Sequence, residues 1–289
     1  MAKLEWYNDL TKFQEDLVKK GFCFGQAFAI TTYCKAPSLN LLYKASFKQL
    51  LDSEHSSYTA SSTSFTYNSS PYSYTQTLST DKSFKNSFSY TPEWNKSLKF
   101  LADLNHSKLQ NTSTFKLSCE YTSKYIKSHL SLENLKSVNI QATSQYKQCG
   151  LGVDLTINSE HKRLSKYDMG FWWFRDDYRL VIKHLSNSPK QYKFGHILGS
   201  LYYKVSKDFD LAGQVVYEKL NGGCQSSVAG RLRVDDGKEL KGRLDDTGML
   251  GISLRNKVGD MVTLITAGQA NILDSQLHFQ VGFRIKINQ

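Results

Sequence analysis

The chain has 289 residues and a formal net charge of +11, which implies an anionic partner of some kind. Its composition, with only 4 Pro beside 17 Tyr and 16 Phe, favours β-strands over helices. No apolar run approaches the roughly 18 residues of a membrane-spanning helix, so a helical membrane protein is excluded. The mean hydropathy of -0.45 still agrees with a β-barrel that has one lipid-facing and one wet face.

Other functional classes find little support in the sequence. Lys and Arg are spread singly along the chain and do not gather beside stacking aromatics, which argues against a nucleic-acid partner. The sequence contains no nucleophile elbow, phosphate-binding loop or HExxH zinc motif. We therefore expect no enzyme activity, no catalytic residues, no metal site and no cofactor. No secretory signal is visible at the start, so export to an extracellular space is not expected.

Residues 1–21 are predicted to form an amphipathic helix. Large apolar residues recur there at helical spacing, with charged residues between them: Trp6, Leu10, Phe13 and Leu17. Gly21 and Gly25 flank a short apolar stretch after this pattern ends. Because glycine accepts backbone angles that other residues avoid, these two positions form a candidate hinge.

Residues 22–289 are predicted to form a succession of β-strands separated by polar turns. Alternation of apolar and polar residues is clear in segments 151–157 and 228–234. Turn signals recur about every 10–17 residues, as a meander of long antiparallel strands requires. The Ser/Thr/Tyr-rich segment 53–95 could also be a disordered linker, but its Tyr and Phe content favours strands.

Four consecutive aromatics, Phe171, Trp172, Trp173 and Phe174, form the charge-free core of one predicted strand. Charged residues flank them on both sides. Aromatics at a charged boundary are typical of the interfacial girdle of a membrane barrel. Aromatic packing in the core of a soluble protein is the alternative.

The last predicted strand, residues 277–287, alternates without an error. One face carries Leu277, Phe279, Val281, Phe283, Ile285 and Ile287, and the other carries His278, Gln280, Gly282, Arg284 and Lys286. A tilted strand that crosses a hydrocarbon layer needs about 9–11 residues, whereas strands of soluble proteins have about 5–6. The length therefore favours a membrane strand.

The basic residues on alternating strands decide which face would meet lipid. A Lys or Arg on the lipid face costs about 2–4 kcal/mol at the bilayer midplane, so the basic face must line a lumen. The candidate lumen residues that attract anions are Arg231, Arg233, Lys241, Arg243, Arg284 and Lys286. A soluble lipocalin-like barrel would reverse this facing, but it closes with about eight strands and would leave half the chain unplaced.

Over nearly its whole length, the chain resembles the voltage-dependent anion channel family of the mitochondrial outer membrane. The segments Tyr7-Asn8-Asp9-Leu10-Thr11-Lys12 and Gly21-Phe22-Cys23-Phe24-Gly25 resemble the family's amphipathic segment and glycine hinge, with Cys23 where glycine is usual. The chain end is similar to the signal for outer-membrane insertion, carried by Gln280, Gly282, Ile285 and Ile287. Residues 235–254 match the family's late signature in part.

The resemblance implies an all-β transmembrane β-barrel of about 19 strands, the odd number for which this family is known, with an N-terminal amphipathic α-helix. It implies two parts: residues 1–21 as a helix in or near the pore, and residues 22–289 as the barrel. The pore-helix residues that it implies are Tyr7, Asp9, Leu10, Lys12, Asp16, Lys19 and Lys20. Helix placement on the membrane surface is the alternative.

The function implied by the resemblance is a voltage-gated, weakly anion-selective channel for ATP, ADP, phosphate and organic anions. Its partners would be the phospholipid bilayer, small anions and nucleotides, and other copies of the chain or outer-membrane translocase and assembly proteins. Two alternatives stay open: a scaffold barrel in a larger outer-membrane assembly, and the protein-import pore of the translocase. Gln76 corresponds to the family's membrane-facing glutamate, so behaviour tied to that carboxylate is not expected here.

Overall fold

The computed structural model describes residues 5–19, 22, 26–36, 40–51, 57–80, 82–108, 111–161, 163–186, 195–218, 222–259, 261–273 and 279–288. The chain divides into two compact units. Unit 1 comprises Met1–Val18, Thr91–Leu101 and Lys116–Gly230, and unit 2 comprises Lys19–Tyr90, Ala102–Phe115 and Arg231–Gln289.

The predicted N-terminal helix is present but is interrupted. A 3-10 helix, η1, spans Tyr7–Asp9, and the α-helix α1 spans Lys12–Val18. The hydroxyl of Thr11 donates to Oε1 of Glu15 at 2.7 Å, a side-chain contact between positions i and i+4 across the first turn of α1. Neither helix in the described part of the chain is long and apolar enough to cross a membrane.

The described residues form nineteen strands, the number expected for the fold. They are β1 (Gln26–Ala36), β2 (Leu41–Leu51), β3 (Ser57–Ser69), β4 (Tyr72–Ser79), β5 (Ser83–Tyr90), β6 (Leu98–Ser107), β7 (Thr112–Thr122), β8 (Ile126–Glu133), β9 (Ser137–Tyr146), β10 (Cys149–Asn158), β11 (Arg163–Phe174), β12 (Tyr178–Leu185), β13 (His196–Lys204), β14 (Phe209–Glu218), β15 (Gly223–Asp235), β16 (Lys238–Asp245), β17 (Met249–Val258), β18 (Val262–Asn271) and β19 (Phe279–Asn288). The Ser-rich segment 53–95 therefore supplies β3, β4 and β5.

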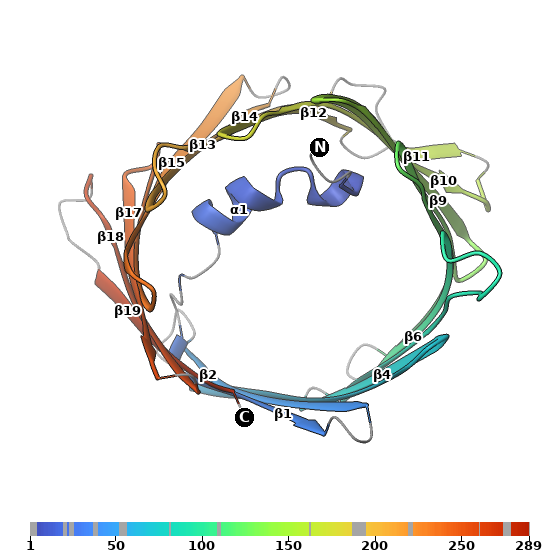
Figure 1. Cartoon of the computed structure of the whole chain (residues 1–289), viewed down its shortest axis with the longest axis horizontal. Helices are drawn as coiled ribbons and strands as arrows, with labels where there is room; N and C mark the ends of the chain where they lie inside the picture. The colour runs from blue at the N-terminus through green and yellow to red at the C-terminus, as the bar shows by residue number, and fades with distance from the viewer. Residues whose placement is uncertain are drawn as a thin grey trace. The chain divides into compact units, whose positions relative to one another are not determined.

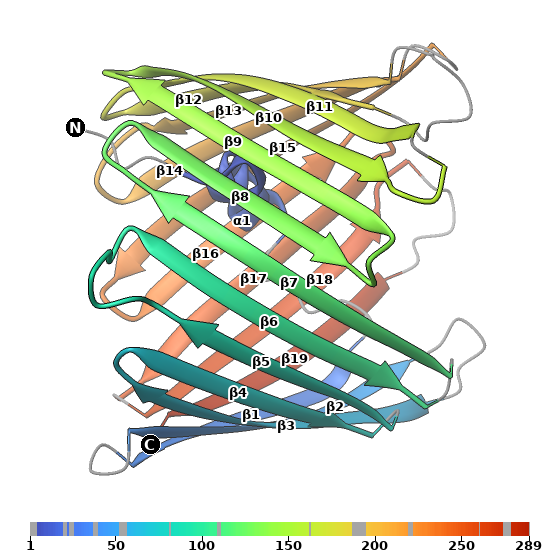
Figure 2. The same cartoon turned by 90° about the vertical axis from the view of Figure 1, so that its right-hand side faces the viewer.

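All nineteen strands belong to one closed sheet, a β-barrel. Successive strands pair antiparallel, as Figure 2 shows for β7, β8 and β9. The closing pair is different: β1 and β19 run parallel, with Ala29 opposite Arg284 and Thr31 opposite Lys286. An up-and-down meander with an odd number of strands must bring its first and last strands together in the same direction.

The aromatic run in β11 does not lie on one surface of the sheet, so a lipid-facing girdle could include only two of its four residues. Phe171 and Trp173 are each 39% exposed on the outer face. Trp172 and Phe174 are 0% and 2% exposed and point to the other face. Successive side chains of a strand alternate between faces, so four consecutive aromatics cannot all meet the same environment.

Candidate functional site: the docked N-terminal segment and a cationic sheet face

In unit 1 the N-terminal segment lies against one face of the sheet, the helix-bearing face. η1 contacts β9 and β10, and α1 contacts β13 and β14, as Figure 1 shows for α1. Leu10 and Leu17 of the predicted apolar stripe are buried against this face. Tyr7 and Leu10 are almost fully buried in a cluster with Trp172, Phe174 and Val181. Leu17 and Val18 pack in a second cluster that includes Tyr202 of β13.

Glycines in β10 give the aromatic rings the space that they occupy. A Cβ atom at Gly150 would lie 2.2 Å from the Trp172 ring, and one at Gly152 would lie 2.9 Å from the Tyr7 ring. Both distances are too short for any side chain, so only glycine permits this close approach. The Trp172 ring therefore lies over Gly150, and the Tyr7 ring lies over Gly152.

Polar contacts fix the start of the segment to the same wall. Nζ of Lys183 donates to the carbonyl oxygen of Tyr7 at 2.9 Å and lies 4.8 Å from the centre of its ring. Nη1 of Arg179 donates to Oε1 of Glu5 at 2.7 Å. The hydroxyl of Thr143 donates to the carbonyl oxygen of Glu5 at 3.0 Å. Sequence reasoning did not identify these three wall residues, whose only signal is their position on the polar face of a strand.

The same burial changes the acid–base properties of the segment. Burial raises the pKa of the Glu5 carboxyl above its ordinary value, with a smaller contribution from Asp9, although the hydrogen bond and charge of Arg179 oppose the shift. Burial also raises the pKa of the Tyr7 hydroxyl, and the carboxylates of Asp168 and Asp154 add to this effect. Tyr7 therefore stays neutral at all physiological pH values.

The charged residues of the predicted pore helix have different positions. Lys12 is exposed and lies 3.7 Å from the Asp9 carboxylate. Asp16 is partly buried and Lys19 is exposed. Lys20 and the hinge residues Gly21 and Gly25 lie outside the described residues.

A buried ionic network lies in the wall on β10 and β11. Nζ of Lys166 is 2.5 Å from the Asp154 carboxylate and 3.1 Å from that of Asp168. Nδ2 of Asn139 donates to Asp154 at 2.6 Å. Each buried carboxylate therefore has a cation and a further hydrogen-bond donor, Asn139 for Asp154 and Ser186 for Asp168, which offset part of its desolvation cost. Among the described residues, no group of His, Cys, Asp or Glu could hold a metal ion.

In unit 2 the predicted lumen residues lie on the polar sides of β15, β16 and β19. Lys241 and Arg243 belong to β16, and Arg284 and Lys286 belong to β19. Arg231 and Arg233 alternate with the exposed Leu232 and Val234 of β15. Glu239 lies 3.3 Å from Lys241, and Asp245 lies 4.0 Å from Arg243, so part of the positive charge is balanced locally.

Two further basic residues join this surface. Strand pairing places Arg255 opposite Ile265, which is itself opposite Arg284. Lys286 experiences electrostatic repulsion from Arg284, Arg255, Lys44 and Lys241. We call Lys44, Lys241, Arg255, Arg284 and Lys286 the cationic face. Sequence reasoning missed Lys44 and Arg255, although each occupies a polar position in its strand.

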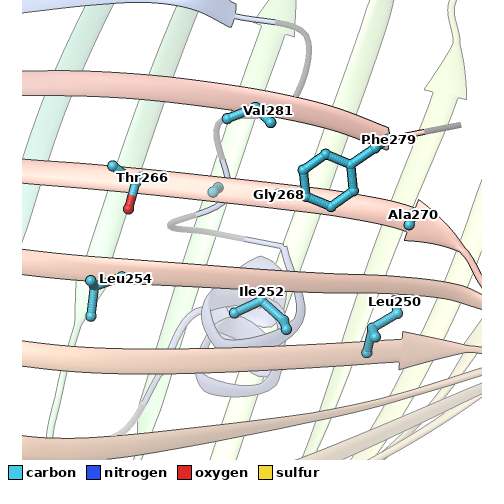
Figure 3. Close-up of a pocket in the computed structure, with 9 residues that line it drawn as sticks. Leu250, Ile252, Leu254, Thr266, Gly268, Ala270, Phe279 and Val281 are labelled. Carbon is cyan, nitrogen blue, oxygen red and sulfur yellow. The ribbon is translucent and has the colours of Figure 1, made fainter.

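The opposite side of the same strands is apolar. Leu250, Ile252 and Leu254 of β17 line a shallow hollow with Phe279 and Val281 of β19, and Gly268 lies between them (Figure 3). The hollow has a volume of about 380 Å³. β17 and β19 therefore have one basic and one apolar face, as the alternation in the sequence predicts.

The residues of the proposed insertion signal lie in β19. Gln280 and Gly282 are on its polar side, where Gln280 accepts a hydrogen bond from Gln269 at 2.7 Å. Ile285 and Ile287 are opposite Leu264 and Val262 of β18 on the apolar side. Gln76 of β4 is opposite Phe65 of β3 and Asn86 of β5, so it shares the outer face with aromatic residues.

A closed barrel whose strands have one apolar and one polar face has the architecture of a transmembrane β-barrel, the class to which porins belong. The chain belongs to the eukaryotic porin family, whose model matches residues 6–282. This membership indicates an outer membrane and a channel, not an enzyme.

Solved structures agree at the level of the fold. A mutant of the Rh. blastica porin has a TM-score of 0.56 and 8% identity, with 84% of this chain and 96% of that chain covered. A second solved structure, described as "Asymmetric conductivity of engineered proteins", has a TM-score of 0.54 and 9% identity, again with 84% of this chain and 96% of that chain covered. No curated protein matches the chain.

Proposed function

We propose that the protein is a voltage-gated, weakly anion-selective channel for ATP, ADP, phosphate and organic anions in the mitochondrial outer membrane. The cationic face of unit 2 is the observation that carries this proposal. Four basic side chains on β2, β16, β17 and β19 act there on a fifth, Lys286 of β19, while the opposite face of β17–β19 is apolar. The apolar face contacts lipid, and the cationic face lines the aqueous path.

The magnitude of the charge effect supports weak selectivity. In a water-filled lumen, two unit charges at 4 Å interact by about 1 kcal/mol, and salt screens charges beyond about 8–10 Å. Such a surface concentrates small anions without trapping them. Glu239 and Asp245 reduce the positive charge further, so cations are disfavoured but not excluded.

We further propose that residues 1–21 form the movable pore element and that Gly21 and Gly25 are its hinge. The docking of Tyr7 and Leu10 on the sheet wall supports a position in the lumen over one on the membrane surface. Voltage would act on charged residues of the segment, such as Lys12 and Lys19, which are exposed. Substitution of both Gly21 and Gly25 by Ala should reduce voltage-dependent closure, and unchanged closure would contradict the hinge.

The experiment that tests the channel is reconstitution into a planar bilayer with a KCl gradient. The reversal potential should show an excess of chloride over potassium permeability. The pair Arg284→Gln and Lys286→Gln should lower that ratio by about twofold, because two positive charges leave the aqueous path. Lys108→Gln, which removes one charge from an exposed turn, is the control and should change the ratio much less.

Two other outcomes would favour the competing functions. A correctly folded barrel that gives no conductance would indicate a scaffold within a larger assembly. Cation preference together with crosslinking to a translocating presequence would indicate a protein-import pore. The net positive charge of the cationic face opposes the second function, because presequences are themselves cationic.

A further inference from the structure

A second basic site lies at the edge of unit 1, where the turns β9–β10 and β11–β12 meet. The cavity there has a volume of about 910 Å³, within the range of roughly 300–1,000 Å³ that is usual for small-molecule sites. Its lining includes Tyr146, Lys147, Gln148, Arg175 and Arg179. All of these residues belong to unit 1, so the site is distinct from the cationic face.

The chemistry of this cavity suits a phosphate group attached to a larger organic body. The cavity is lined by three cations, Lys147, Arg175 and Arg179, and by one carboxylate, Asp176. A guanidinium fork matches two phosphate oxygens at once, which a lysine ammonium cannot do. The Tyr146 ring is 70% exposed, and Nζ of Lys147 lies 5.4 Å from its centre. The ring offers a stacking surface beside a positive charge.

One cation of the cavity lining, Arg179, is already paired with the N-terminal segment. Oε1 of Glu5 lies 2.7 Å from Nη1 of Arg179, whose guanidinium is 4.8 Å from the centre of the Phe174 ring. The other two cations of the lining, Arg175 and Lys147, are exposed. A phosphate that contacts all three cations must compete with Glu5 for Arg179.

We propose that this cavity binds the phosphate group of an organic phosphate and that binding loosens the contact between Glu5 and Arg179. Two sources have the same chemistry: a nucleoside phosphate that arrives from water, and the headgroup of an anionic lipid at the membrane edge. The site does not require conduction. A negative result in the binding test can therefore be distinguished from a negative result in the conductance test of the proposed channel.

Calorimetric titration of the full chain in zwitterionic detergent tests the proposal. The probes are ADP, adenosine and a short-chain phosphatidic acid. Arg175→Gln should weaken phosphate binding by about tenfold, because a charged hydrogen-bond donor is lost. Arg163→Gln is the matched control, since it removes an exposed arginine at the opposite end of β11, and it should leave the affinity unchanged.

Glu5→Gln gives a prediction of the opposite sign. It removes the carboxylate that competes for Arg179, so phosphate binding should become several-fold tighter. Binding of ADP but not adenosine identifies the aqueous source, and binding of phosphatidic acid alone identifies the lipid. The proposal is wrong if adenosine binds as well as ADP, if no phosphate compound binds, or if Arg175→Gln behaves like Arg163→Gln.

Discussion

At the scale of single residues, docking of the N-terminal segment depends on the absence of side chains in the wall. Trp172 and Tyr7 occupy space that any Cβ atom at Gly150 or Gly152 would fill. Two polar side chains nearby, Lys183 and Arg179, hold the segment through hydrogen bonds to Tyr7 and Glu5. The position of the segment on the sheet is therefore set by close packing in β10 and β11 and by two cations from β12.

Gly150→Ala should disturb this docking. Its Cβ atom would lie 2.2 Å from the Trp172 ring, so the ring must move toward the segment. We expect a loss of about 1–3 kcal/mol of docking free energy, as is usual for overpacking. Hydrogen exchange of the amides in α1 measures the effect. Gly213→Ala is the control, because nothing lies within 4 Å of its added Cβ atom; equal exchange in both variants would contradict the role of Gly150.

Glu5 should make docking depend on pH. Its pKa is raised in the docked state, chiefly by burial, so the docked state binds a proton more tightly than the released state. Docking is therefore most favourable below the ordinary pKa of a glutamate and weakens as pH rises through the raised pKa. Amide exchange in α1 should be slower at about pH 5 than at about pH 7 after correction for intrinsic rates.

Glu5→Gln should remove that difference, since an amide does not titrate. Glu93→Gln, at an exposed turn position of the same unit, is the matched control and should retain it. The same pH dependence in both variants would show that another group is responsible. Asp9, Lys127 and Arg179 are the other charges that act on Glu5.

At the scale of secondary-structure elements, the N-terminal segment is held at both ends. The η1 end has the aromatic cluster and the polar contacts of Glu5 and Tyr7. At the α1 end, Leu17 and Val18 pack against β13, β14 and β15, and Nε2 of Gln14 donates to the carbonyl oxygen of Arg179 at 3.4 Å. The break between η1 and α1 follows from the two different surfaces on which the halves pack.

Lys183→Met tests the attachment of η1 to the sheet. Methionine keeps most of the side-chain volume but cannot donate to the carbonyl oxygen of Tyr7, which Lys183 does at 2.9 Å. Loss of a hydrogen bond from a charged donor should cost about 1.5–3 kcal/mol of docking. Limited proteolysis within residues 5–19 should accelerate accordingly. Lys204→Met, at the exposed end of β13, is the control, and an equal acceleration there would contradict the role of Lys183.

The sequence predicts the strands and their two faces because side-chain alternation is a local property. Leu240 and Leu244 of β16 and Val281 of β19 are exposed on the apolar face, as their spacing indicates. Contacts between distant segments leave no such signal. Glu5 and Arg179 are separated by 174 positions, and the burial of Trp172 depends on Tyr7, which only the folded chain brings near.

At the scale of the whole molecule, an odd number of strands requires one parallel pair, and β1–β19 is that pair. This pair lacks the short hairpin that sets the register of antiparallel neighbours. Its register depends on side chains alone, where the small polar Thr31 of β1 meets Lys286 of β19. The cationic face thus reaches the strand pair that closes the sheet.

Disulfide formation between β1 and β19 tests this closure in a chain whose five Cys are replaced by Ser. Thr32 is opposite Ile287 in the parallel pair, so Thr32→Cys with Ile287→Cys should form a crosslink in the folded protein. Neighbouring strands lie about 4.8 Å apart, which suits a disulfide. Thr32→Cys with Phe283→Cys is the control: its second site is four residues away, about 13 Å along the strand, and should not react. A crosslink between the two strands closes the chain into a covalent loop, which changes its mobility on a non-reducing gel. Crosslinking of the control pair alone would contradict the parallel register. Absence of both crosslinks would contradict closure through this pair.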